Sequence, residues 1–209
     1  MIKEDPHEAL PVFLLFATIT VFSPGPGVVM TLTNAIRCGF RNTFGGILGI
    51  AFGAFVVAAI SATSIGFILA TSALAFTIIK YIGAAYLVYL GVRLWRTPAL
   101  RIEKKSIHEA SFGRRFIEGV SLQLTNPKVI FFYLSIFPQF IDPTMNYSVQ
   151  FGVLVLTYSS LVVIIHSFYA VTARRAKRWF NSERGGRAIN KVGGAVFVFF
   201  GAALATAKR

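Results

Sequence analysis

The sequence predicts an all-α polytopic membrane protein with six transmembrane helices in two inverted three-helix repeats, the first helix of each repeat being broken. Long apolar stretches predict the membrane helices. Basic residues concentrated in alternate loops predict their orientation. Two proline-containing interruptions, half a chain apart, predict the repeats.

The apolar stretches are long enough to cross a bilayer, which takes about 20 residues per helix. With 55% hydrophobic residues in 209, the chain carries more apolar surface than one soluble core could bury. The run from Ile47 to Trp95 would be about 70 Å long as a single helix, so it must fold back near Ala70, Thr71 and Ser72. The expected spans are residues 9–33, 46–69, 74–95, 116–140, 148–172 and 189–206.

The basic residues explain the net charge of +13 without a nucleic-acid partner, because they cluster after the first, third and fifth expected spans. The turn after the second span and the segment 142–148 contain no Lys or Arg. By the positive-inside rule the basic loops are cytoplasmic and both termini lie outside. The basic residues of these loops are Arg37 and Arg41; Arg96, Arg101, Lys104, Lys105, Arg114 and Arg115; and Arg174, Arg175, Lys177, Arg178, Arg184, Arg187 and Lys191.

Metal, redox and enzyme chemistry have little support in the sequence. The single cysteine, Cys38, excludes an internal disulfide or dithiol pair, and His7 and His108 fall in loops without a metal-binding cluster. The chain lacks a zinc-protease motif, a nucleophile motif and paired aspartates within its spans. We therefore expect no enzymatic activity, no cofactor and no bound metal.

Two of the expected spans are interrupted by residues that break helices. Within a membrane such breaks are tolerated where protein or a water-filled cavity covers the freed polar groups, so both should face the interior. The first interruption consists of Ser23, Pro24, Gly25, Pro26 and Gly27; the second consists of Thr125, Asn126, Pro127 and Lys128.

The spacing of the interruptions indicates an internal duplication. Pro24 and Pro127 are 103 positions apart, and each falls in the first helix of three. A duplicated unit with an odd number of spans enters the membrane from opposite sides, which gives an inverted repeat. The expected units are residues 1–100 and 112–209, with the basic cytoplasmic loop 96–115 between them; the same offset pairs Gly49 with Gly152 and Gly91 with Gly194.

The breaks also suggest a binding site. Ser23 and Asn126 suit the N-cap of the half-helix that follows each break, with Pro24 and Pro127 at the first helical position. A helix N-terminus attracts a carboxylate, and the carbonyls that end the preceding half-helices could accept hydrogen bonds from an ammonium. An amino-acid zwitterion would fit both; plain proline kinks are the alternative.

Charged residues inside the spans are further candidates. Lys80 and Lys128 should face a polar interior because a charge at the bilayer centre costs about 3 kcal/mol, although Lys80 could instead reach the headgroups. Glu118, Asp142 and His166 are candidates for proton coupling. For the two acids the alternative is simple solvation, and for His166 a hydrogen bond to a neighbouring helix.

The second span carries Gly45, Gly49 and Gly53 at four-residue spacing. This spacing lets another helix approach closely, either within the chain or in a homodimer.

Taken together, several segments resemble the LysE/RhtB amino-acid exporter family along nearly the whole chain. The resemblance implies six spans in two inverted halves, a bacterial inner-membrane location, and efflux of amino acids, coupled to protons, along a path lined by residues 24–26 and 126–128. The chain departs from the family pattern at Gly27, where an Asn or Asp usually follows Pro-Gly-Pro. The segments are Ser23-Pro-Gly-Pro26, Tyr81-Ile-Gly-Ala-Ala-Tyr-Leu-Val-Tyr-Leu-Gly91, Leu124-Thr-Asn-Pro-Lys-Val-Ile-Phe-Phe132 and Phe137-Pro-Gln-Phe-Ile-Asp142.

The function expected from the sequence is secondary active export of small, neutral amino acids. The expected partners are the amino-acid substrate and the lipid bilayer. A purely cationic substrate is disfavoured because the spans offer no mid-membrane acid to offset its charge. A cation exporter or ion channel is the alternative, favoured if Asp142 or Glu118 lines a continuous pore.

Overall fold

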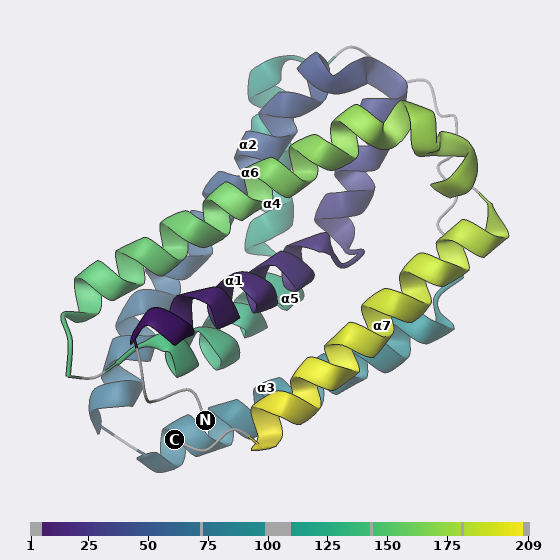
Figure 1. Ribbon diagram of the computed structural model, residues 1–209. Helices are drawn as coiled ribbons and strands as arrows, with labels where there is room; N and C mark the ends of the chain where they lie inside the picture. The colour runs from purple at the N-terminus through teal and green to yellow at the C-terminus, as the bar shows by residue number, and fades with distance from the viewer. Residues whose placement is uncertain (1–5, 72, 99–109, 143, 181, 207–209) are drawn as a thin grey trace.

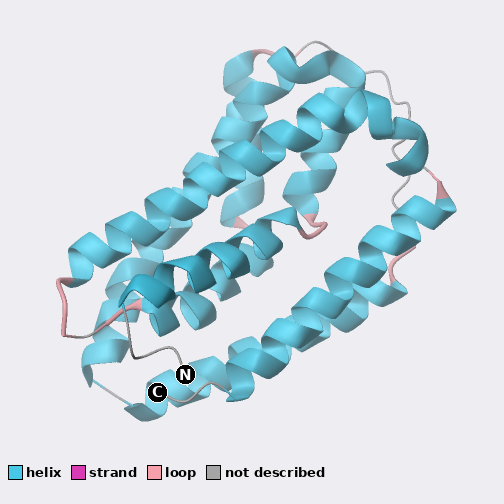
Figure 2. Cartoon of the chain, in the orientation of Figure 1, coloured by secondary structure: helices cyan, strands magenta, loops and turns pink. Residues whose placement is uncertain are grey.

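The computed structural model describes residues 6–71, 73–98, 110–142, 144–180 and 182–206, and within them every regular element is helical (Figures 1 and 2). The elements in chain order are α1 (Pro6–Phe22), α2 (Pro26–Thr71), α3 (Ala73–Arg96), α4 (Phe112–Leu124), α5 (Pro127–Phe131), the π-helix η1 (Phe132–Ile136), the 3₁₀-helix η2 (Phe137–Phe140), α6 (Tyr147–Phe180) and α7 (Glu183–Thr206).

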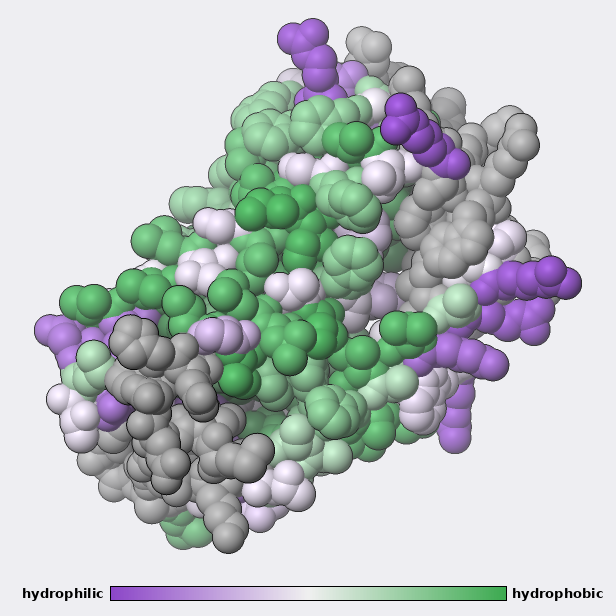
Figure 3. All heavy atoms as spheres, in the orientation of Figure 1, coloured by the Kyte–Doolittle hydropathy of each residue, from purple (hydrophilic) through white to green (hydrophobic). Residues whose placement is uncertain are grey.

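Among the described residues, 3 segments are long and apolar enough to cross a membrane: Pro26–Ser61, Tyr147–Ala173 and Arg184–Thr206. Leu10–Phe22 is a shorter apolar helix. In Figure 3 hydrophobic side chains cover most of the middle of the visible face, and hydrophilic ones gather along its top and right side, with a smaller group at the left. The bend in α2, the C-termini of α3 and α6 and the N-termini of α4 and α7 lie toward the upper right (Figure 1).

The two interrupted helices run inward from opposite ends of the molecule (Figure 1). Helix α1 starts at the end where α7 finishes, whereas α4 starts at the end with the bend in α2. Both stop near the middle, where Figure 2 shows the short connections to α2 and α5. The chain then continues in each case toward the far end, through the first part of α2 or through α5, η1 and η2. The predicted breaks are therefore present.

Several predicted boundaries are wrong in detail. We expected a loop at 34–45, but the helix continues there and only Gly39 leaves helical geometry, with φ 78° and ψ 173°. A positive φ is accessible to glycine at little cost, so one residue bends α2 without a loop. Helix α6 extends to Phe180 and α7 starts at Glu183, beyond the apolar limits, because a helix can continue into the water with a polar sequence.

The other helix limits agree better with the sequence. Helix α2 ends at Thr71 and α3 begins at Ala73, at the predicted turn; Ser72 lies outside the described residues. The fourth expected span ends at residue 140 as predicted, but its second half passes from α-helix to π-helix and then to 3₁₀-helix. Pro138 at the start of η2 lacks an N–H and cannot continue an α-helical ladder, which accounts for the change of winding.

Glycines allow the closest helix contacts. A Cβ on Gly49 would collide with the Phe116 backbone, and one on Gly53 would lie 2.7 Å from Gln123 Cβ, so the glycine stripe of α2 packs on α4 within the chain. A Cβ on Gly91 would lie 2.6 Å from the Gly194 carbonyl oxygen, and one on Gly194 would lie 2.7 Å from that of Gly91. Helices α3 and α7 therefore cross with their backbones in contact at these two glycines.

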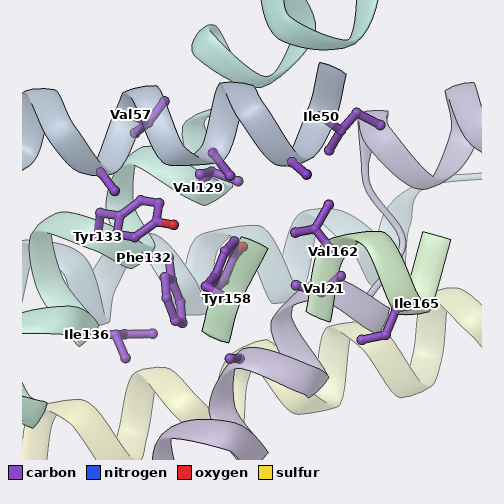
Figure 4. Packing of buried hydrophobic residues seen from close by; sticks show 14 of the residues in the cluster. Val21, Ile50, Val57, Val129, Phe132, Tyr133, Ile136, Tyr158, Val162 and Ile165 are labelled. Atoms are coloured by element: carbon purple, nitrogen blue, oxygen red, sulfur yellow. The ribbon is translucent and has the colours of Figure 1, made fainter. Parts of the chain in front are cut away.

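Aromatic side chains fill the space between the broken helices. Phe13 of α1 contacts the rings of Phe132, Phe137 and Phe140, with centroids 5.3–6.1 Å apart. Tyr158 of α6 packs 4.8 Å from the ring of Phe132. Figure 4 labels Phe132 and Tyr158 among the buried side chains of α1, α2, α5, η1 and α6 that form one apolar core.

The glycine contact between α2 and α4 predicts unequal effects of two alanine substitutions. Gly49→Ala should lower the free energy of unfolding by about 1–3 kcal/mol, because the new methyl group meets the Phe116 backbone. Gly152→Ala should leave it unchanged or raise it by up to about 1 kcal/mol, because a Cβ there has no neighbour within 4 Å and alanine favours helix. Thermal unfolding of the purified variants in one detergent measures both; equal midpoints would contradict the packing.

Candidate functional site

The two breaks meet at a small polar cavity inside the apolar core. Its volume is about 10 Å³, which is room for about one water molecule. The cavity is therefore too small for an amino acid in this conformation. The lining residues are Val21 of α1; Gly27, Val28 and Ile50 of α2; Gln123 of α4; Asn126, Lys128 and Val129 at the start of α5; and Tyr158, Val162 and His166 of α6. Figure 4 labels Val21, Ile50, Val129, Tyr158 and Val162 around this region.

The carbonyl groups at the end of α1 are bound by side chains from distant parts of the chain. Lys128 Nζ donates hydrogen bonds to Thr20 O at 2.9 Å, Ser23 O at 3.1 Å and Ser23 Oγ at 3.4 Å. We call these three oxygens the oxygen cradle. Tyr169 Oη of α6 donates to Phe22 O at 2.7 Å. Together the two side chains supply donors to the carbonyls of Thr20, Phe22 and Ser23 at the end of α1.

Lys128 donates its hydrogen bonds to neutral acceptors. They are backbone carbonyls and a hydroxyl, which bear partial negative charge at the C-terminal end of a helix. The half-buried side chain crosses from α5 to α1 and passes Gly25, where a Cβ would lie 3.1 Å from Nζ. The place proposed for a substrate ammonium at the end of α1 is therefore occupied by the ammonium of the protein itself.

The second break has the predicted cap and the first does not. Asn126 Oδ1 accepts a hydrogen bond from Lys128 N at 3.2 Å, and Pro127 is at the first position of α5. Ser23 does not cap α2: its hydroxyl donates back to Thr20 O at 2.8 Å, so Ser23 belongs to the end of α1. Helix α2 begins later, at Pro26. The Pro-Gly-Pro sequence offers two possible starts, and the long-range contacts of Ser23 decide between them.

The other residues of the first break have distinct environments. Pro24 packs on α7, since a Cβ on Gly193 would lie 2.8 Å from Pro24 Cδ. Pro26 is exposed, as is Pro127. Gly27 lines the cavity and faces His166, whose Cε1 would lie 3.2 Å from a Cβ at this position.

His166 is buried in the cavity wall on α6. Its Nδ1 and Thr31 Oγ1 of α2 are 2.7 Å apart and share a hydrogen bond. Thr31 is fully buried, so the bond joins α6 to the first part of α2 next to the break. His166 thus combines a bond to a neighbouring helix, as expected of a lone histidine in a span, with a position facing the cavity.

Three predicted candidates lie away from the cavity. Lys80 Nζ is 4.8 Å from the ring centroid of its neighbour Tyr81 on α3. Glu118 Oε1 is 3.3 Å from Arg114 Nε on the outer face of α4, and both line a separate surface groove. Asp142 is exposed in the loop before α6 and accepts hydrogen bonds from the amide and hydroxyl of Thr144. None of the three is among the residues that line the cavity.

Four site residues were not anticipated from the sequence: Thr31, Gln123, Tyr158 and Tyr169. Gln123 Oε1 accepts a hydrogen bond from Asn126 Nδ2 at 3.2 Å, which orients the cap of α5. The polar residues of α6 do carry a signal. His166 and Tyr169 are three positions apart, and Tyr158 is eight before His166, so all three share one helix face.

Broken helices that meet around a polar cavity within an apolar helical core are the architecture of a membrane transporter. A family model agrees: the LysE type translocator matches residues 18–208. The chain therefore belongs to the LysE type translocator family and is a membrane transporter, as the resemblance implied.

Named relatives match over nearly their whole length. The chain is 39% identical over 196 residues to an uncharacterized membrane protein of Vibrio cholerae serotype O1, covering 94% of this chain and 96% of the relative. It is 34% identical over 196 residues to the homoserine/homoserine lactone efflux proteins of Salmonella typhimurium and Salmonella typhi, covering 94% of this chain and 95% of each relative. No solved structure gives a significant match.

The contacts of two buried tyrosines predict that their hydroxyl groups contribute differently to the free energy of unfolding. Tyr169→Phe should lower the free energy of unfolding by about 1 kcal/mol, because Phe22 O loses its donor. Tyr133→Phe is the matched control: its hydroxyl is buried and has no hydrogen-bond partner, so removing it should cost nothing. Thermal unfolding of both variants tests this, and a Tyr133→Phe loss as large as that of Tyr169→Phe would refute it.

Proposed function

We propose that this protein is a secondary active transporter that exports small, neutral amino acids across the bacterial inner membrane, coupled to proton entry. The observation that carries the proposal is the meeting of two helix breaks, half a chain apart, at one buried polar cavity. Such midplane sites between broken helices hold the substrate in secondary transporters. Membership of the LysE type translocator family supports the same reading.

The relatives support an amino-acid-like substrate. Two of them are named for efflux of homoserine and homoserine lactone. A lactone lacks the free carboxylate and the free side-chain hydroxyl of the parent amino acid, so the α-ammonium is the charged group that the two molecules share. We infer that the substrate of this chain also carries an α-ammonium and a short side chain.

A neutral side chain on the substrate fits the charges around the cavity. Lys128 is the only Lys, Arg, Asp or Glu among its lining residues. A basic side chain would add a second positive charge beside Lys128 with no carboxylate to offset it, which is costly in a membrane interior. The same argument disfavours the alternative of a cation exporter or channel, since Asp142 and Glu118 do not line the cavity.

We assign proton coupling to His166 in the wall of the cavity. Of the three coupling candidates, His166 alone lines it, and histidine titrates nearest to physiological pH. Its bond to Thr31 connects α6 to the helix that follows the first break. A change in the charge of His166 would therefore act on both halves of the molecule.

An inverted repeat of two three-helix units is part of the proposal, with alternating access produced by rocking of one unit against the other. Helix α3 pairs with its counterpart α7. The equivalent residues Gly91 and Gly194 touch, as residues near a pseudo-two-fold axis would. Gly49 and Gly152 match less well, because only Gly49 is in close contact. Helices α1 and α4 enter from opposite ends (Figure 1).

Export measurements test the function and the site together. Cells preloaded with dipeptides, one amino acid at a time, should lose the exported amino acid faster when they express the protein. Asn126→Ala and Lys128→Ala should slow this export at least about tenfold, because the first removes the cap of α5 and the second leaves the carbonyls at the end of α1 without their charged donor whenever the cavity is empty. Thr206→Val, an exposed position on α7, is the control. Wild-type export by both site variants, at equal membrane levels, would refute the site.

The proposed orientation can be tested with single cysteines. In a Cys38→Ser background, Met145→Cys should react with an impermeant thiol reagent added to intact cells, because the loop before α6 lies outside. Arg184→Cys should react only after the cells are opened. Both positions are exposed, so access to the thiol reports the side of the membrane. The reverse labelling pattern would overturn the assignment of the termini to the outside.

A further inference from the structure

The oxygen cradle has the composition of a binding site for a primary ammonium group. An ammonium carries three N–H donors, and the cradle offers three oxygen acceptors, all within 3.4 Å of Lys128 Nζ. Thr20 and Ser23 are both buried, so the oxygens face the protein interior. The α-ammonium of an amino acid has the same three donors as the side chain of lysine.

The carbonyls at the corresponding end of α4 are bound by donors from neighbouring residues instead. There Thr125 Oγ1 donates to Ser121 O at 3.0 Å and to Leu122 O at 3.3 Å, and Asn126 N donates to Gln123 O at 3.1 Å. These donors are neighbours in the chain and form a local cap. Of these two helix ends, it is the α1 end whose carbonyls accept hydrogen bonds from side chains of other helices, Lys128 and Tyr169, which can leave without unwinding α1 itself.

We propose that the oxygen cradle binds the α-ammonium of the exported amino acid, and that Lys128 occupies the cradle in its place when no substrate is present. The inference rests on the proposed function and assigns the part of the substrate that this end of the cavity recognises. Lys128 is then an internal competitor of the substrate. One ammonium fills the cradle, so substrate entry requires that Lys128 withdraw.

The surroundings of Lys128 agree with this exchange. The cavity of about 10 Å³ is too small to hold an amino acid while the Lys128 side chain occupies its wall in this position. Gly25 lies at the position equivalent to Lys128 under the 103-residue offset, and a Cβ there would lie 3.1 Å from Nζ. One half of the molecule therefore supplies the ammonium and the other supplies the space and the oxygens that receive it.

A chemical-complementation experiment tests the cradle without reference to transport. Lys128→Ala deletes three carbons and the ammonium, which is the size of n-propylammonium. Purified Lys128→Ala should bind n-propylammonium, and its unfolding temperature should rise by about 2–4 °C once the amine reaches several times its dissociation constant. Wild-type protein should show no rise, because Lys128 already fills the cradle.

Matched controls make the result specific. Lys128→Met fills the same space with an apolar chain and should not respond to n-propylammonium. Lys80→Ala loses a lysine outside the cavity and should not respond either. Tetramethylammonium chloride at the same concentration supplies the charge without N–H donors, and it should not stabilise Lys128→Ala.

The outcomes separate this inference from the proposed function. Two results would overturn the proposal that the cradle binds an ammonium group, even if wild-type cells export amino acids. One is an equal response of Lys128→Ala and Lys128→Met to n-propylammonium, and the other is equal stabilisation of Lys128→Ala by n-propylammonium and tetramethylammonium. Selective stabilisation of Lys128→Ala by n-propylammonium supports the cradle. Failure of wild-type cells to export any amino acid would overturn the proposed function by a separate measurement.

Discussion

A helix that stops inside an apolar core exposes backbone carbonyls that must find donors, and this constraint shapes the rest of the structure. Water is scarce there, and each unpaired group costs several kcal/mol. In α1 the donors are Lys128 Nζ and Tyr169 Oη, which come from α5 and α6. Meeting that requirement brings the two breaks together, and the polar cavity follows from their meeting.

Much of the fold could be predicted because its signals are local. The length of the apolar stretches predicted helices, and the prolines and glycines predicted both breaks. Asn126 followed by Pro127 predicted a helix cap, which the structure confirms. The errors have physical causes as well. A single positive-φ residue, Gly39, replaced an expected loop. Ser23 was misplaced by one helix because its side chain and the Lys128 ammonium meet across 105 residues, a contact that no local pattern encodes.

The two breaks share a proline and differ in chemistry. Position 25 is glycine and position 128 is lysine at equivalent points of the two breaks. The α4 end is capped by Thr125 next to it, whereas the α1 end depends on distant side chains. A symmetric pair of lysines would place two cations within contact distance and leave fewer oxygens to bind them. With glycine at one break and lysine at the other, a single charged group lies between the two breaks.

None of the described residues of α3 and α7 lines the cavity, yet both helices are connected to it through packing contacts. The side chain of Ser135 in η1 sits directly against Gly83 of α3, and α3 in turn packs on α7 at Gly91 and Gly194. Helix η1 continues directly from α5. The segment α5–η1 therefore contacts α3 near its end, through Ser135, and is hydrogen-bonded to α1 near its start, through Lys128. The contact with α3 does not involve Lys128, so the α3–α7 pair anchors this segment independently of the hydrogen bonds to α1.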